Sequence, residues 1–144
     1  MGKARKKRPQ RVRHEPIAPR LTQEETVQHS GLIADLSSLS ETKRESTLAL
    51  ISSITRFNSR LVSPELLAKL HLRLMDAVPK VRVLAANALR NIATEASMVG
   101  RLIQAGTPGA VISILASEMR PEGPWAESSL PLCVHLVHTL TNIL

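Results

Sequence analysis

Apolar residues recur every three or four positions from Leu21 onward, which is the spacing of an amphipathic helix. Residues 1–20 show no such period. The clearest stripe lies in the segment 80–95, where apolar positions follow the order i, i+3, i+4, i+7, i+8 and i+11. These positions are Val81, Leu84, Ala85, Ala88, Leu89 and Ile92. The pattern therefore predicts a helical body that begins near residue 21.

Three further stripes predict helices over 22–38, over 41–57 and from Ser63 onward. Ser40 and Ser63 precede two of them as N-caps. The proline after Ser63 suits the first helical position, where its missing N–H costs nothing, and Pro79 opens the 80–95 helix in the same way. The apolar positions are Val27, Leu32, Ile33, Leu36 and Leu39 in the first helix, Leu48, Ile51, Ile54 and Thr55 in the second, and Leu66, Leu67, Leu70 and Leu74 in the third.

The remaining third of the sequence predicts helices separated by turn residues. The segment 97–119 is interpreted as a short helix, a turn from Gly106 to Gly109, and a second helix. The RPEGP stretch at 120–124 predicts a loop. A final helix is expected over 125–144, which Pro131 either restarts or kinks.

The second helix of each predicted unit repeats one pattern. The segments LALISSIT (48–55), AANALRNIAT (85–94) and LVHTLTNIL (136–144) share a register in which Ser53, Asn91 and Asn142 fall at equivalent places. Periods of this size with paired or tripled helices indicate an all-α fold of the α-solenoid type. Residues 21–144 are thus predicted to hold about three HEAT- or armadillo-like repeats.

The composition supports stacked helices. Phe57 and Trp125 are the only aromatic residues, and a core of Leu, Ile, Ala and Val at helical spacing favours helices over a sandwich or barrel. A single cysteine, Cys133, excludes an internal disulfide framework and is compatible with a reducing compartment. No stretch approaches the roughly 18 uninterrupted apolar residues of a membrane helix, so no membrane partner is expected.

The positive charge of the chain is concentrated at one end. The formal net charge is +7, and residues 1–20 hold eight Lys or Arg and one acid, Glu15, so residues 21–144 sum to zero. The density of like charges and the prolines predict a disordered basic tail over 1–20. The positive charge therefore indicates a targeting signal or a partner-binding tail rather than a property of the fold.

The tail and the repeats together resemble the symportin family of nuclear import chaperones. The resemblance rests on the opening Met-Gly-Lys, the Arg and Lys run, the stretch Arg13-His14-Glu15-Pro16-Ile17-Ala18, and VRVLAANALRNIA at 81–93. It implies a shuttling protein of nucleus and cytoplasm that holds two large-subunit ribosomal proteins that bind 5S rRNA, and travels on a transportin-type receptor. Family members are several times longer, and the chain lacks a polar cap at Ile143-Leu144, so an N-terminal portion, truncated at its C-terminus, is expected.

The tail carries the predicted import signal. An acidic receptor channel would attract the basic cluster, and Pro16-Ile17 would supply a stiff apolar anchor at little cost in ordering entropy. Ile17 replaces the Tyr of the standard signal. A simple basic signal read by importin-α, a solubilising arm and non-specific contact with RNA phosphates stay open as alternatives. The predicted receptor-binding residues are Lys3, Arg5, Lys6, Lys7, Arg8, Arg11, Arg13, Pro16 and Ile17.

Asn91 and Asn142 are candidates for a peptide groove. In armadillo proteins an Asn at this place bonds the backbone of an extended peptide, because an amide offers a donor and an acceptor together. Solvated asparagines are the alternative. This sequence departs from the armadillo pattern, since Ser53 replaces the first Asn, and Asn87 and His138 stand where a Trp is expected.

The sequence gives no basis for an enzyme or a cofactor. It lacks a Gly-rich phosphate loop, a triad spacing and a paired-carboxylate motif. Cys133, His135 and His138 do not share one helix face, so packed histidines and a buried thiol are expected rather than a metal site. The predicted function is a nuclear import adaptor in ribosome biogenesis. The alternatives are a ribosome-assembly scaffold whose tail binds rRNA and a generic armadillo interaction module.

Overall fold

The computed structural model describes residues 21–54, 58–118 and 130–144. Over these ranges the chain forms seven α-helices, one short 3-10 helix and no strand, which confirms the all-α prediction. The elements are α1 (Gln23–Leu36), α2 (Glu41–Ile54), η1 (Ser59–Leu61), α3 (Pro64–Arg73), α4 (Pro79–Ala93), α5 (Ala96–Gln104), α6 (Thr107–Glu118) and α7 (Leu130–Ile143).

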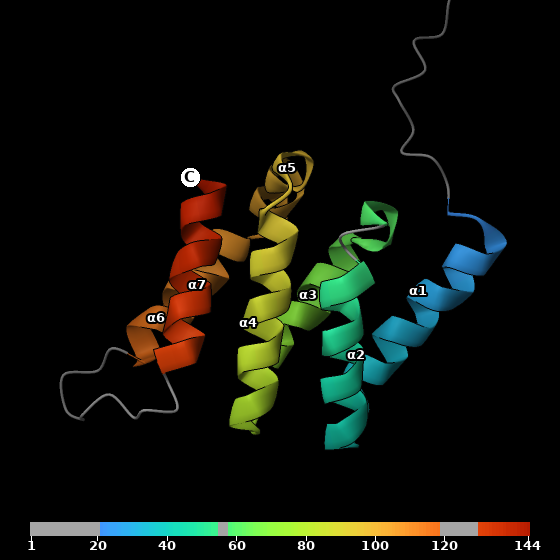
Figure 1. The fold of residues 1–144 in the computed structure, drawn as a ribbon, viewed down its shortest axis with the longest axis horizontal. Coiled ribbons are helices and arrows are strands. Elements are labelled where there is room, and N and C mark those ends of the chain that lie inside the picture. The colour runs from blue at the N-terminus through green and yellow to red at the C-terminus, as the bar shows by residue number, and fades with distance from the viewer. Residues whose placement is uncertain (1–20, 55–57, 119–129) are drawn as a thin grey trace, which may run out of the picture.

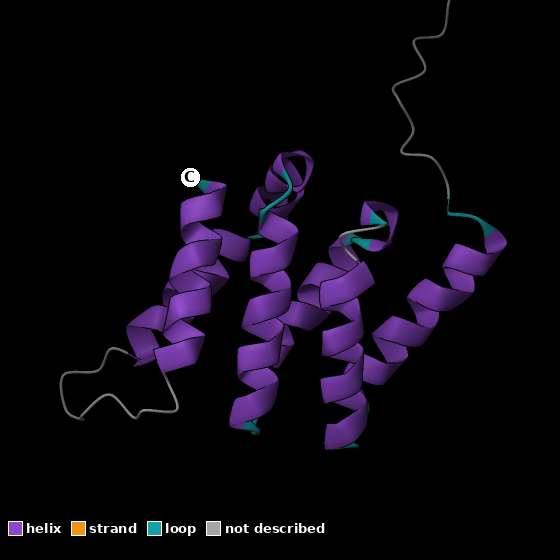
Figure 2. Ribbon diagram, in the orientation of Figure 1, coloured by secondary structure: helices purple, strands orange, loops and turns teal. Residues whose placement is uncertain are grey.

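The helices form two rows. In the first row α2, α4 and α7 stand side by side and run in the same direction, with α4 packed against both neighbours (Figure 1). In the second row α3 packs against α1 and α6. The rows are stacked, because α1 packs on α2, α3 on α4 and α6 on α7, while α5 contacts α4, α6 and α7. Within the described ranges, Figure 2 shows helices and short loops and no strand.

The starts of two helices follow from side-chain caps. The hydroxyl of Thr22 accepts from the Glu25 N–H at 3.1 Å, and the Glu25 carboxylate accepts from the Thr22 N–H at 3.3 Å, which closes a capping box ahead of α1. Ser63 accepts from the Leu66 N–H at 3.0 Å and Pro64 opens α3. The predicted Ser63-Pro64 helix start is therefore confirmed.

The core is centred on α4. The predicted stripe of this helix is buried at five of its six positions, and Leu84 is half-buried. Ala86 and Ala93 are buried as well, because α4 has a neighbour on each side. Complete burial of a Leu or Ile side chain contributes about 1.5–3 kcal/mol. The fully buried residues from α4 include Val81, Ala85, Ala88, Leu89 and Ile92.

Two details of the predicted helices were wrong. Leu39 is fully exposed, because α1 ends at Leu36 with Ser37 as its C-cap, and Val27 keeps 69% of its surface. The predicted turn from Gly106 to Gly109 is shorter than expected. Within this turn Gly106 alone adopts a positive φ, at 77°, and α6 already includes Thr107 and the two residues after it.

Some predictions lie outside the described residues. These are the tail over 1–20, the end of the second predicted helix at 55–57, and the segment 119–129 with the 120–124 loop. Within the described part of the last helix, Pro131 stands in the first turn of α7, where a proline interrupts no helical hydrogen bond.

Candidate interaction surface

Three polar residues occupy the same position in the three helices of the first row. Ser53, Asn91 and Asn142 are each the thirteenth residue of their helix, which places the sequence-predicted asparagines on adjacent helices α4 and α7. Asn91 is half-buried, whereas Ser53 and Asn142 are exposed. The structure thus brings Asn91 and Asn142 onto neighbouring elements, and their binding of a peptide stays a prediction.

A guanidinium and an imidazole join α4 to α7. Arg90 Nη1 lies 3.3 Å from His135 Nδ1. A guanidinium can only donate, so Nδ1 accepts and the proton of the neutral ring is on Nε2. Burial lowers the pKa of His135, and the charges of Arg90 and His138 lower it further. The pair therefore favours a neutral imidazole at this boundary.

An arginine repeats at the start of α2 and of α4. Arg44 donates from Nη1 to the Ser38 carbonyl at 2.8 Å, and Arg82 donates from Nη1 to the Asp76 carbonyl at 3.0 Å. Each acceptor precedes its arginine by six residues. The same contact thus ties the turn before each helix to the helix itself.

Asp76 connects these two turns. Its side chain is 3% exposed and lies 3.0 Å from Arg44 Nε and 2.9 Å from Arg73 Nη1. One of its carboxylate oxygens also accepts from the Val78 N–H at 2.9 Å. The Arg44 Nε–H is not aligned for a hydrogen bond despite the short distance, but Arg44 Nη2 donates to Asp76 Oδ1 at 3.4 Å, so the ion pair also includes a hydrogen bond. A buried ion pair therefore links α2 to the turn before α4, beside the apolar core.

Histidines couple the helices of the second row. His29 Nε2 lies 2.6 Å from the Ser63 hydroxyl, and His71 Nε2 lies 2.9 Å from the Thr107 hydroxyl. Both hydroxyls precede a proline at the start of a helix. Burial lowers the pKa of the half-buried His71. The joints from α1 to α3 and from α3 to α6 thus use the same pair of groups.

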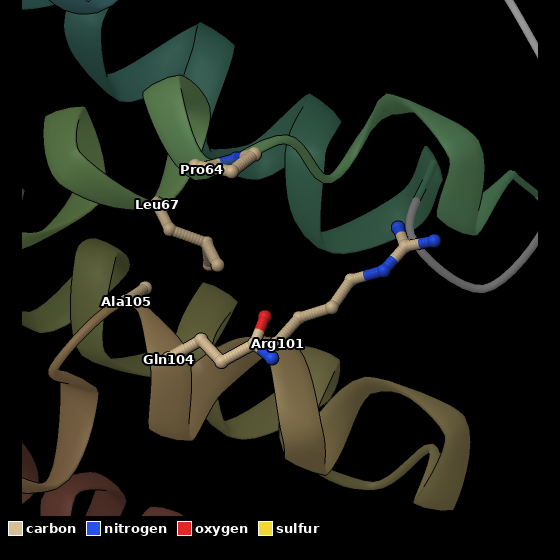
Figure 3. A pocket seen from close by; sticks show the side chains of 5 residues that line it. All are labelled: Pro64, Leu67, Arg101, Gln104 and Ala105. Carbon is tan, nitrogen blue, oxygen red and sulfur yellow. The ribbon is translucent and has the colours of Figure 1, made fainter. Parts of the chain in front are cut away.

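A small hollow lies between the start of α3 and the end of α5 (Figure 3). Leu67 points from α3 toward α5, and Arg101 extends from α5 along its edge. The Arg101 guanidinium donates to the carbonyls of Ser59 and Val62 at 3.3 Å each, so it holds the η1 segment. The hollow encloses about 90 Å³, too little for an ordinary small-molecule site of about 300 Å³ or more.

The cysteine and the histidines of α7 do not form a metal cluster. Cys133 is buried, and its pKa is raised by burial and by the Glu118 carboxylate. His138 is exposed, whereas His135 faces Arg90. In the ranges 21–54, 58–118 and 130–144, no group of three His, Cys, Asp or Glu could hold a metal ion.

No single helix of the described ranges is long and apolar enough to cross a membrane. Helices α5 and α6 pass the same test of length and composition only as a pair, bent by 75°. This is weak support for a membrane segment, because core helices of globular proteins pass the same test.

Sequence reasoning missed the polar contacts that repeat between units. The separation that relates Ser53 to Asn91 also relates Arg44 to Arg82, so the same superposition of segments contained this signal. The hydroxyl-proline pairs at 63–64 and 107–108 were a second signal. The histidine partners are distant in sequence and required the fold.

The predicted receptor-binding residues, Lys3 to Ile17, lie outside the described residues. Comparison with known proteins gives no match to a family model, to a curated protein or to a solved structure.

Proposed function

We propose that this chain is a non-enzymatic α-solenoid adaptor for nuclear import, similar to the symportin chaperones that carry large-subunit ribosomal proteins. The observation that carries the proposal is the order of groups in the tail. A basic cluster at residues 3–8 precedes Arg13, and Pro16-Ile17 follows after two residues. Such an order suits a receptor with an acidic channel and a separate apolar site.

The solenoid part of the proposal is supported by contacts that repeat from unit to unit. Arg44 and Arg82 bond their own turns alike, and His29 and His71 bond the next hydroxyl-proline start alike. Each pair of helices also packs on the following pair. Nearest-neighbour packing of similar units is the property that defines a solenoid.

The separation of charge supports different roles for the tail and for the helical body. The tail holds the whole excess of positive charge, while residues 21–144 are neutral. In this proposal the tail engages a transportin-type receptor and the helical body holds its partner. The identity of the cargo, ribosomal proteins that bind 5S rRNA, rests on the resemblance of the tail and of residues 81–93.

The test of the import signal uses residues 1–20 fused to a fluorescent reporter. Replacing Pro16-Ile17 with Ala-Ala should abolish nuclear entry and transportin capture while affinity for RNA is unchanged, because no positive charge is removed. Pro9→Ala is the matched control and should leave both intact. Entry that survives the Ala-Ala change, with RNA binding lost only when Arg and Lys are removed, would favour the rRNA-binding scaffold instead.

A further inference from the structure

The packed α4–α7 pair contributes no acidic side chain of its own to the face that the two helices share. Neither Pro79–Ala93 nor Leu130–Ile143 includes an Asp or a Glu. The two helices carry instead three cations, two histidines and three asparagines: Lys80, Arg82, Arg90, His135, His138, Asn87, Asn91 and Asn142. Such a face is electrostatically unsuited to a basic ligand and suited to a carboxylate-bearing one.

The cations of this face differ in what they already bind. Lys80 Nζ lies 3.1 Å from the Glu45 carboxylate, and Arg82 donates to the turn at Asp76. Arg90 Nη1 lies 3.3 Å from the His135 ring, and Arg90 has no carboxylate partner within the described ranges. One bond to His135 uses one of five guanidinium N–H donors, so Arg90 keeps donors for a bidentate carboxylate.

The neighbours of Arg90 extend the site along both helices. Asn87 and Asn91 lie one turn apart on α4, and both are half-buried. On α7, His138 and Asn142 are exposed. The side chains of these asparagines have no hydrogen-bond partner among the described residues. Their amides are therefore available to the backbone of an extended chain.

We propose that the α4–α7 face binds an extended acidic peptide segment, with a Glu or Asp carboxylate on Arg90 and the peptide backbone on Asn91 and Asn142. The proposal builds on the row of α2, α4 and α7 and not on the import signal. The import proposal and the peptide-binding proposal can be refuted independently, because the binding measurement below needs no import receptor.

The test uses the full chain with the seven Lys and Arg of residues 1–13 replaced by Gln, since the basic tail would itself attract acidic ligands. The probe is a fluorescein-labelled Glu-Ser repeat peptide of about ten residues, which at about 3.3 Å per residue crosses three packed helices. Fluorescence anisotropy should detect binding of this peptide and none of a Lys-Ser counterpart.

Substitutions on α4 and α7 test whether the acidic peptide binds to the α4–α7 face. Arg90→Gln, and separately the pair Asn91→Ala with Asn142→Ala, should each weaken binding roughly tenfold, whereas Gln28→Ala, an exposed amide on α1, should not. If Arg90→Gln loses its cooperative thermal transition, Arg90→Lys replaces it, because it keeps the charge and loses the bidentate fork. Binding that vanishes with the tail charges overturns the proposal. So does binding unaffected by these variants, or an RNA oligonucleotide that binds this background with the same Arg90 dependence.

Discussion

Asp76 provides the sharpest test of how the first two helix pairs are joined. Replacing Asp76 with Asn keeps the shape and removes the charge that two guanidinium groups face at 3.0 and 2.9 Å. Loss of one partner from a buried ion pair costs about 3–5 kcal/mol. The side chains of Arg44 and Arg73 keep 11% and 23% exposure, so water partly solvates them, and we expect a loss of about 2–3 kcal/mol.

The loss would lower the melting temperature by roughly 5–10 °C, as measured by circular dichroism, and would shift the urea midpoint in parallel. Asp35→Asn is the matched control. Asp35 lies on α1, is half-buried and has no side-chain partner among the described residues, so its replacement should cost less than about 0.5 kcal/mol.

A double-mutant cycle separates the interaction energy of the Arg44–Asp76 pair from the general effect of removing a charge. Arg44→Met combined with Asp76→Asn should cost about 1–2 kcal/mol less than the sum of the single changes, because both remove the same contact. Additive losses, or a loss for Asp76→Asn no larger than that of Asp35→Asn, would refute the proposed contribution of the Arg44–Asp76 ion pair to the packing of α2 on α4.

Further predictions concern pH, the turn and the thiol. Burial lowers the pKa of His71 and His135 in the folded chain below the ordinary 6.5, so the unfolded chain takes up protons first. The urea midpoint should thus be highest above about pH 6.5 and fall as pH is lowered through the folded pKa values; replacing both residues with Gln should flatten this part of the profile. Gly106→Ala should destabilise by about 1 kcal/mol in urea titration because φ is 77°, whereas Gly100→Ala, in α5 with open space around it, should stabilise by up to about 1 kcal/mol. Cys133 should react slowly with a thiol reagent in buffer and rapidly in urea, because it is buried and burial raises its pKa; equal rates would contradict that placement.

The spacing of hydrophobic residues predicted the helices well where a single apolar stripe accounts for most buried positions. The α4 stripe and the Ser63 cap are local signals, and both hold in the structure. The prediction that Leu39 is a buried helix position was wrong, because Leu39 lies beyond the end of α1 and belongs to no helix face. The helix ends at Leu36, and Ser37 is its C-cap. Gly109 was taken for a turn residue, although Thr107 had already started α6.

The polar contacts were less predictable, because they depend on which helices become neighbours. Arg90 and His135 are separated by 45 residues, and nothing local to either one specifies the other. Asn91 and Asn142 were predicted as a pair because their helices repeat, and their role stays a prediction. Arg90 stands one residue before Asn91, yet its contact with His135 depends on α7 lying beside α4.

The packing of each helix pair on the next also affects how the chain can fold. The inter-helix side-chain bonds of the described residues join partners no farther apart than Arg90 and His135. Such a chain has few distant contacts, and helical proteins of this kind fold near the fast end of the known range of rates. Helices α1 and α2 can dock as soon as α3 and α4 have been synthesised, so folding can follow the growing chain from one pair to the next.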